Sequence, residues 1–197
     1  MANELPLISP DKFHDECAVF GIYGHKEAAN LAYLGLYALQ HRGQEASGIV
    51  SNDGEQFYVE KGQGLVADIF SQQALARLPG TMAIGHNRYS TAGGAGLKNV
   101  QPLSVNFAFG NLAVAHNGNL INATMLRSEL EAYGAIFQST SDTEVIIHLI
   151  AHSRADTLLD RVIDSLTQVR GAFSVVLMTD QGIVAARDPH GFRPLCL

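Results

Sequence analysis

The stretch "GIVSNDGEQFYVEKG", residues 48–62, decides the fold. At its centre stands Asp53-Gly54, a pair that favours the tight turn whose twist matches two flanking antiparallel strands. A similar pattern occurs near the C-terminal end, where "AFSVVLMT" and "IVAAR" are separated by a turn at Asp180 to Gly182. Both patterns predict hairpins, so we expect antiparallel sheets.

Further strands and a long helix are predicted around these hairpins. The strand segments are "CAVFGIYG" (17–24), "TMAIGHNRY" (81–89) and "LAVAHNG" (112–118), and each is apolar enough to be buried. Apolar residues on most faces of residues 27–39 favour a buried helix that Gly43 ends. Strands grouped in hairpins and helices grouped in pairs argue against βαβ alternation and predict an α+β fold of antiparallel sheets packed with helix layers.

Polar residues and glycines mark the ends of the remaining predicted helices. Ser, Asn and Asp accept hydrogen bonds from the free N–H groups of a first turn, and Gly ends a helix readily. The predicted starts are Ser71, Asn122, Ser141 with Glu144 in a capping box, and Asp156, and the predicted stops include Gly134 and Gly171.

Composition excludes several classes of partner. The 197 residues are 47% hydrophobic and 16% charged, enough for a buried core in one domain or two small ones. With 13 basic against 19 acidic residues and a net charge of −6, no basic surface suits a nucleic acid. No stretch reaches the roughly 18 apolar residues of a membrane span. Two cysteines at opposite ends of the chain favour a reducing compartment, so we expect a cytoplasmic protein.

Cys17 is the first candidate for chemistry. Residues 1–16 carry two prolines, several charges and no periodicity, so they have the character of a detachable leader. A free cysteine at the start of a strand is commonly just a buried residue. Removal of the leader, however, would place an α-amine of pKa roughly 7.7 to 8.0 beside the thiol, uniting nucleophile and base in one residue.

Other polar residues describe a ligand when they are considered together. Arg88 suits a carboxylate, Asn117 and Gly118 in "HNGN" could aim two donors at an oxyanion from a tight turn, and Asp142 suits an ammonium. Each also has a simpler interpretation, such as a structural ion pair, a turn or a helix cap. With Cys17, these groups match an amino acid that has a reactive side-chain carbonyl, and glutamine fits that description.

The spacing of the residues argues against a metal site and a phosphate site. His148 and His152 are spaced i, i+4 on a predicted helix, but no Glu stands in the HExxH position and no third ligand is evident. The glycine-rich stretch "GGAGLKN", residues 93–99, lacks the spacing of a phosphate loop.

The order of the motifs carries a family resemblance. The chain closely resembles the N-terminal glutaminase domain of glutamine phosphoribosylpyrophosphate amidotransferases, class II glutamine amidotransferases of the N-terminal-nucleophile hydrolase superfamily. The resemblance covers residues 17–197, and it is carried by "CAVFGIYG", "GLYALQHRGQEASGI", "KGQGLV", "GHNRYSTAG", "NVQPL", "AHNGNLIN", "SDTEV" and "DPHGFRPL".

The resemblance implies a four-layer αββα sandwich and a role for each motif residue. Residues 1–16 would be a propeptide, and Cys17 the nucleophile, with its α-amine as the general base. The other implied roles are Asn117 and Gly118 as the oxyanion hole, Arg88 for the glutamine carboxylate, Asp142 for its ammonium, and Arg42 and Gly43 in the loop that closes over glutamine.

The resemblance also implies partners beyond this domain. Ammonia released from L-glutamine would pass to a phosphoribosyltransferase domain, expected outside these 197 residues, and would form 5-phosphoribosylamine, the first committed step of purine synthesis. We expect no cofactor or metal in this domain. Magnesium, and in some relatives an iron–sulfur cluster, would belong to the transferase domain, and the full-length enzyme is expected to be a homo-oligomer.

Two alternatives stay open at this point. The domain could serve another synthase of the glucosamine-6-phosphate or asparagine type, although in those enzymes the cysteine typically follows the initiator Met directly. It could also bind glutamine without hydrolysing it, and an uncleaved leader would be enough to cause this.

Overall fold

The hairpin predicted from residues 48–62 lies in a four-stranded antiparallel sheet of the computed structural model, which describes residues 17–89 and 96–197. Its two strands pair directly, with Val50 opposite Val59. The strand order of this first sheet is β1-β4-β2-β3, formed by β1 (Ala18–Tyr23), β4 (Met82–Arg88), β2 (Ala46–Asn52) and β3 (Phe57–Gln63).

The second predicted hairpin closes a second antiparallel sheet. Its strand order is β5-β6-β7-β8, formed by β5 (Leu103–Phe107), β6 (Gly110–Leu120), β7 (Gly171–Thr179) and β8 (Ile183–Arg187). The long strand β6 pairs with β5 over its first half and with β7 over most of its length. Among the described strands, the second half of β6 therefore pairs with β7 alone.

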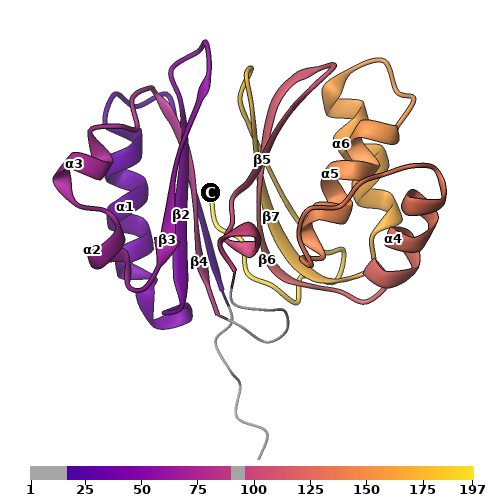
Figure 1. Ribbon diagram of the computed structural model, residues 1–197, viewed down its shortest axis with the longest axis horizontal. Coiled ribbons are helices and arrows are strands. Elements are labelled where there is room, and N and C mark those ends of the chain that lie inside the picture. Colours follow the sequence, from indigo (N-terminus) through magenta and orange to yellow (C-terminus); the bar gives the residue numbers. More distant parts are fainter. Residues whose placement is uncertain (1–16, 90–95) are drawn as a thin grey trace, which may run out of the picture.

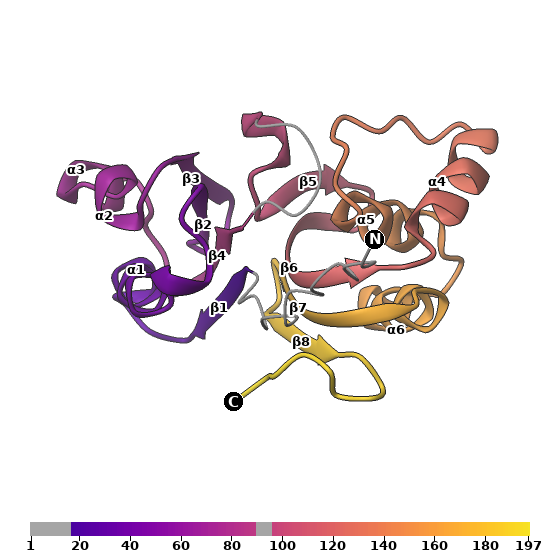
Figure 2. The ribbon, with the colours of Figure 1, turned by 90° about the horizontal axis from the view of Figure 1, so that it is seen from below.

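The two sheets pack face to face, and helices cover their outer faces (Figures 1 and 2). The first sheet is covered by α1 (Ala28–Ala38), α2 (Val66–Ile69) and α3 (Gln72–Leu75). The second is covered by α4 (Ala123–Ala132), α5 (Thr143–His152) and α6 (Leu158–Gln168), and short 3₁₀ turns occur at Gln40–Arg42 and Leu97–Asn99. The predicted αββα sandwich is confirmed.

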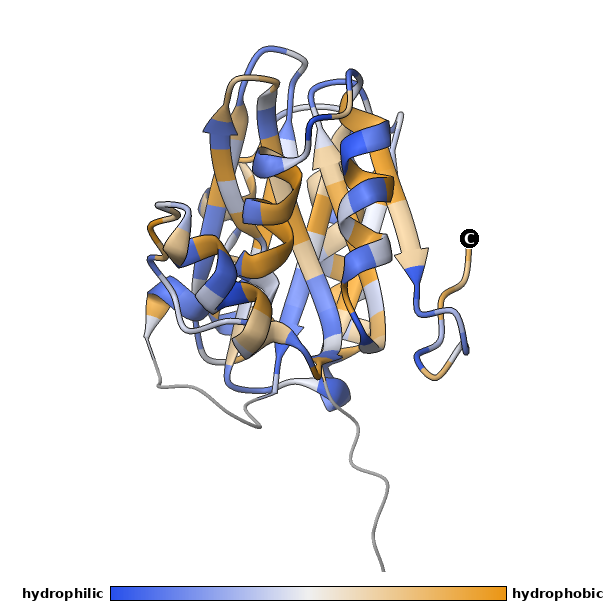
Figure 3. Cartoon of the chain, turned by 90° about the vertical axis from the view of Figure 1, so that its right-hand side faces the viewer, coloured by the Kyte–Doolittle hydropathy of each residue, from blue (hydrophilic) through white to orange (hydrophobic). Residues whose placement is uncertain are grey.

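Most strands contribute residues to two cores, because successive side chains point to opposite faces. On β6, Val114 packs in the core beneath α5 and α6, whereas Ala115 packs between the sheets with Ile84 and Val176. Figure 3 faces the α4–α6 layer, where hydrophilic and hydrophobic residues are mixed along each helix. Within the described ranges, no helix has the length and apolar character needed to cross a membrane.

Several local predictions need correction. Asn122 precedes α4 but makes no cap, because its side chain bridges to the backbone of Gln168 and Arg170. Glu144 does not complete a capping box with Ser141, because its carboxylate accepts hydrogen bonds from the backbone N–H groups of residues 138 and 139.

Other helix and strand boundaries also differ from the predictions. The helix predicted to start at Asp156 is capped instead by Thr157, whose hydroxyl accepts from the Asp160 N–H. This helix ends before Gly171, which begins β7. Strand β5 and helix α2 were not predicted. Both are short, and neither has strong turn residues at both ends.

Candidate active site

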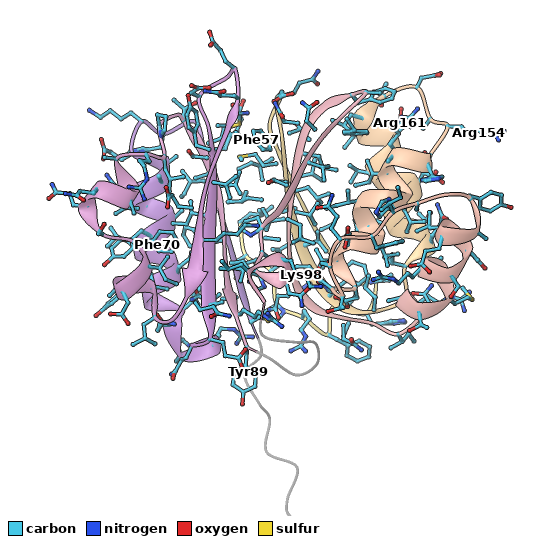
Figure 4. The ribbon with its side chains drawn as sticks, in the orientation of Figure 1. Phe57, Phe70, Tyr89, Lys98, Arg154 and Arg161 are labelled. Carbon is cyan, nitrogen blue, oxygen red and sulfur yellow. The ribbon has the colours of Figure 1, made fainter. Side chains whose placement is uncertain are left out.

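A cavity of about 340 Å³ lies where both sheets and the helix layer of the second sheet contribute residues. Its lining includes Cys17 just before β1, Arg88 at the end of β4, Gly118 in β6 and Asp142 just before α5. Tyr89 also lines it, and Figure 4 shows this side chain at the lower edge of the sandwich. The fold thus brings together four of the residues that the sequence singled out.

Cys17 is half-buried, and both its side chain and its carbonyl oxygen make hydrogen-bond contacts. Its Sγ lies 3.5 Å from the Tyr89 N–H, which donates to it, and 3.6 Å from the Tyr89 carbonyl oxygen. Its carbonyl oxygen accepts a hydrogen bond of 3.0 Å from Nε of Arg42. Its φ of +46° is unusual for a residue with a side chain. The thiol is therefore held in the cavity lining by the backbone of Tyr89, the residue after β4.

Gly43 has a structural role that differs from the predicted one. Its φ of −168° is extended, so it is not the left-handed stop of a helix, and α1 ends earlier. A β-carbon at Gly43 would lie 2.7 Å from the carbonyl carbon of Arg88, which explains why this position needs glycine. Arg42 and Gly43 thus touch the backbones of Cys17 and Arg88, although neither lines the cavity.

Arg88 is the last residue of β4 and is only 9% exposed. It stands opposite Ala46 of β2, so its backbone is fixed by a central strand of the first sheet. A guanidinium with so little access to water needs negative or polar groups around it. Arg88 contributes to the cavity wall, and a planar guanidinium is suited to bind a carboxylate.

The "HNGN" sequence is part of β6, not the tight turn that we predicted. Asn117 is 4% exposed, and within the described part of the chain its buried Oδ1 has no hydrogen-bond partner. Gly118 has a φ of +144°, and a β-carbon there would lie 2.0 Å from the Ala172 carbonyl oxygen of β7. The glycine therefore allows β6 and β7 to approach closely beside the cavity.

Asp142 does not cap α5 through its side chain. One carboxylate oxygen accepts the Leu120 N–H at 2.9 Å, and the other lies 3.5 Å from Nδ1 of His116. Burial acts to raise the pKa of Asp142, but the His116 ring and the backbone N–H groups outweigh burial and hold the pKa below its ordinary value. The carboxylate is thus ionised at neutral pH and faces the cavity.

Sequence reasoning missed a layer of polar residues that supports the site. The His116 N–H donates to Oε1 of Gln101 at 2.7 Å, and Asn99 exchanges two hydrogen bonds of 3.0 Å with Thr140. All four of these residues line the cavity. In the sequence, these residues share only their polarity and a position beside predicted buried segments. That pattern is too common to identify them as part of a site.

Some predicted features lie either outside the described residues or away from the cavity lining. The leader at residues 1–16 and the start of the glycine-rich stretch 93–99 lie outside the described residues. In the described ranges, no three His, Cys, Asp or Glu side chains gather around one point as metal ligands. His148 packs against Phe137, and His152 Nδ1 lies 3.0 Å from the His148 carbonyl oxygen.

Comparisons with known proteins identify the family that this chain resembles. Residues 86–197 match the family described as "Glutamine amidotransferase domain". The chain is 55% identical over 188 residues to the amidophosphoribosyltransferase of Rhizobium etli, which covers 95% of this chain and 38% of that relative. It is 49% identical over 187 residues to an amidophosphoribosyltransferase of Lacticaseibacillus casei, which covers 94% of this chain and 96% of that relative.

A solved structure extends the similarity to three dimensions. The glutamine phosphoribosylpyrophosphate (PRPP) amidotransferase from B. subtilis complexed with ADP and GMP matches with a TM-score of 0.85 and 50% sequence identity. The match covers 89% of this chain and 38% of that chain. The 197 residues therefore span well under half the length of the Rhizobium and Bacillus proteins.

Proposed function

This chain belongs to the amidophosphoribosyltransferase family of enzymes, and from that premise we propose that its cavity hydrolyses L-glutamine to glutamate and ammonia. The single observation that carries the proposal is the convergence of Cys17, Arg88, Gly118 and Asp142 on one cavity. A nucleophile, a carboxylate-binding cation, an oxyanion donor and an ammonium-binding anion together match glutamine.

Recognition of the amino acid would come from two opposite charges. Arg88 binds the α-carboxylate through paired guanidinium N–H groups, and Asp142 accepts the α-ammonium. The low pKa of Asp142 supports this role because the carboxylate must be ionised at neutral pH. These contacts leave the side-chain amide of glutamine to extend towards Cys17.

Chemistry would begin once cleavage before Cys17 has created an α-amine. The amine takes the thiol proton, and the thiolate attacks the side-chain carbonyl carbon. The carbonyl oxygen becomes an oxyanion that accepts from the Asn117 amide and the Gly118 N–H. The α-ammonium of Cys17 then returns its proton to the amide nitrogen as the C–N bond breaks, and ammonia departs. Water attacks the thioester, giving up its proton to the amine, and releases glutamate and the Cys17 thiolate.

The acceptor of the ammonia is the second element of the proposal. The relatives are named amidophosphoribosyltransferases, and one solved relative is named for PRPP. These names support transfer of ammonia to phosphoribosylpyrophosphate in a phosphoribosyltransferase domain, with 5-phosphoribosylamine as the product. They favour this acceptor over those of the glucosamine-6-phosphate and asparagine enzymes.

The remaining features of the proposal concern the setting of the enzyme. We assign magnesium, and any iron–sulfur cluster, to the transferase domain and no cofactor to residues 17–197. We further propose a cytoplasmic location and a homo-oligomeric full-length enzyme, with no nucleic-acid or membrane partner.

Intact mass and glutaminase activity test the proposal together. We expect the purified protein to lack residues 1–16 and to release equal amounts of glutamate and ammonia. Cys17→Ala should abolish release, while calorimetry still detects glutamine binding, because Arg88 and Asp142 remain. Cys196→Ala is the matched control, since the Cys196 side chain is exposed and does not line the cavity, and it should keep full activity. Wild-type turnover in the Cys17→Ala protein would refute the mechanism.

A further inference from the structure

The carboxylate of Asp188 accepts four hydrogen bonds around the chain beyond β8. We call residues 188–197 the C-terminal segment, and Figure 2 shows it looping back beside β8. Asp188 is 1% exposed, and its Oδ1 accepts the N–H groups of His190 and Phe192, both at 3.0 Å. Its Oδ2 accepts those of Arg193 at 3.1 Å and Phe173 at 3.3 Å. One side chain thus organises the loop and ties it to β7.

A second bond fastens the C-terminal segment to the next residue of β7. The hydroxyl of Ser174, which is fully buried, donates to the Pro194 carbonyl oxygen at 2.9 Å. Buried hydrogen bonds of this kind are costly to break because the freed groups have no water to replace them. Two adjacent residues of β7, Phe173 and Ser174, are therefore anchored to the C-terminal segment.

These two residues stand directly opposite the proposed oxyanion hole. In the β6–β7 register, Phe173 faces Gly118 and Ser174 faces Asn117. Phe173 uses both its N–H and its carbonyl on Asp188, the carbonyl accepting the Asp188 N–H at 2.8 Å. Facing residues of an antiparallel ladder alternate between hydrogen-bonded and non-hydrogen-bonded pairs, so Gly118 lies at a non-hydrogen-bonded position and its N–H points away from β7.

Among the described strands, none pairs with β6 on the side to which the Gly118 N–H points. The ladder between β5 and β6 ends at the pair Leu103 and Val114, four residues before Gly118. The N–H is therefore directed towards the cavity that Gly118 lines. The close approach of Gly118 to Ala172 means that its position follows that of β7.

We propose that the C-terminal segment positions the oxyanion hole of this enzyme, with Asp188 and Ser174 as the positioning residues. Neither touches glutamine. Their hydrogen bonds fix Phe173 to Asp188 and Ser174 to Pro194, and these two residues of β7 set the positions of Gly118 and Asn117. The inference rests on the glutaminase function proposed above.

The other end of the same sheet offers a matched comparison. Asp180 also joins neighbouring parts of this sheet, because its carboxylate accepts the Asn111 N–H at 2.8 Å and the Asn111 side-chain amide at 2.9 Å. Asn111 lies near the start of β6, at the opposite end of the strand from Gly118. Asp180 does not line the cavity, so its loss should affect stability without affecting chemistry.

The experiment compares Asp188→Asn, Ser174→Ala and Asp180→Asn in the mature wild-type background. Ammonia release gives kcat and KM for glutamine, and thermal unfolding gives the stability of each variant. An asparagine at position 188 retains one acceptor oxygen, so part of the four-bond cage is lost. We expect kcat to fall about 10- to 100-fold, as for small displacements of catalytic groups, with KM changed by less than about twofold.

KM for glutamine should stay nearly unchanged in both variants, because Arg88 lies on β4 and Asp142 just before α5, and neither lies on β7. Asp180→Asn should lose stability but keep kcat within about twofold of wild type. If Asp188→Asn does not fold, Ser174→Ala tests the same inference, because it removes a single hydrogen bond and should lower kcat alone. The inference would be overturned if the wild type is active and a folded Asp188→Asn or Ser174→Ala variant has the same kcat as Asp180→Asn. An inactive wild type would overturn the proposed function as well.

Discussion

Replacing Gly118 by alanine tests whether the close approach of β6 and β7 sets the catalytic geometry. The methyl group would lie 2.0 Å from the Ala172 carbonyl oxygen and 2.8 Å from the Phe173 Cα, while φ stays at +144°. Side-chain carbons essentially never lie within 3.0 Å of such atoms, so β6 and β7 must separate by about 1 Å. This separation would displace residue 118, whose N–H is proposed to bind the oxyanion.

Two costs follow from this geometry. The strained φ costs about 1–3 kcal/mol and the overlap costs about 1–3 kcal/mol, so we expect the free energy of unfolding to fall by about 2–6 kcal/mol. For a domain of this size, that loss lowers Tm by about 5–20 °C. A displacement of about 1 Å at a catalytic group lowers kcat about 100-fold. KM should change less than kcat, because Arg88 lies on β4 and Asp142 precedes α5, and only the Leu120 N–H joins Asp142 to β6.

Gly80→Ala separates the loss of stability from the loss of catalysis. Gly80 has a φ of +114°, and a β-carbon there would also lie 2.0 Å from a carbonyl oxygen, that of Asn52. It precedes β4, whereas Arg88 ends that strand, so the strain lies at the far end of the sheet from the cavity. Thermal unfolding should show similar losses for both variants, and steady-state glutaminase assays should show lower kcat only for Gly118→Ala. Equal kcat in the two variants would refute the reasoning.

Two further predictions concern charge. Asp142→Asn keeps an acceptor for the Leu120 N–H but removes the negative charge that would bind an ammonium. KM for glutamine should therefore rise about 10- to 100-fold in steady-state assays, and an unchanged KM would disprove the assignment. Burial lowers the pKa of His86 from 6.5 to about 3, although its hydrogen bond to the His116 carbonyl opposes this, so the unfolded chain binds a proton that the folded protein does not. Stability should therefore fall as the pH drops below 6.5, by up to about 1.4 kcal/mol per pH unit, and denaturant titrations of His86→Gln should show a flatter pH dependence than wild type.

The secondary structure was most predictable where local chemistry decides it. The turn at Asp53-Gly54 carries the hairpin of β2 and β3, because that pair favours the turn whatever surrounds it. Predictions failed where a side chain found a distant partner. Asn122 has the right type for a helix cap, yet it binds the backbone at residues 168 and 170 instead.

The sequence by itself determined the antiparallel fold class and the candidate residues Cys17, Arg88, Gly118 and Asp142. Periodicity and turn residues report structure within a few positions, and the ordered motifs carried the family resemblance. Their meeting in one cavity was only a hypothesis at that stage, because no local pattern reports which strands will face each other.

Only the tertiary structure decided what supports these residues. It made "HNGN" a strand rather than a turn, it placed His116 beside Asp142, and it placed Asp188 on the far side of β7 from Gly118. Such contacts join residues far apart in the chain, so they exist only after the two sheets and their helices have packed. The physical reason is that sheet register and face-to-face packing are set by the whole core, whereas a sequence pattern samples only its nearest neighbours.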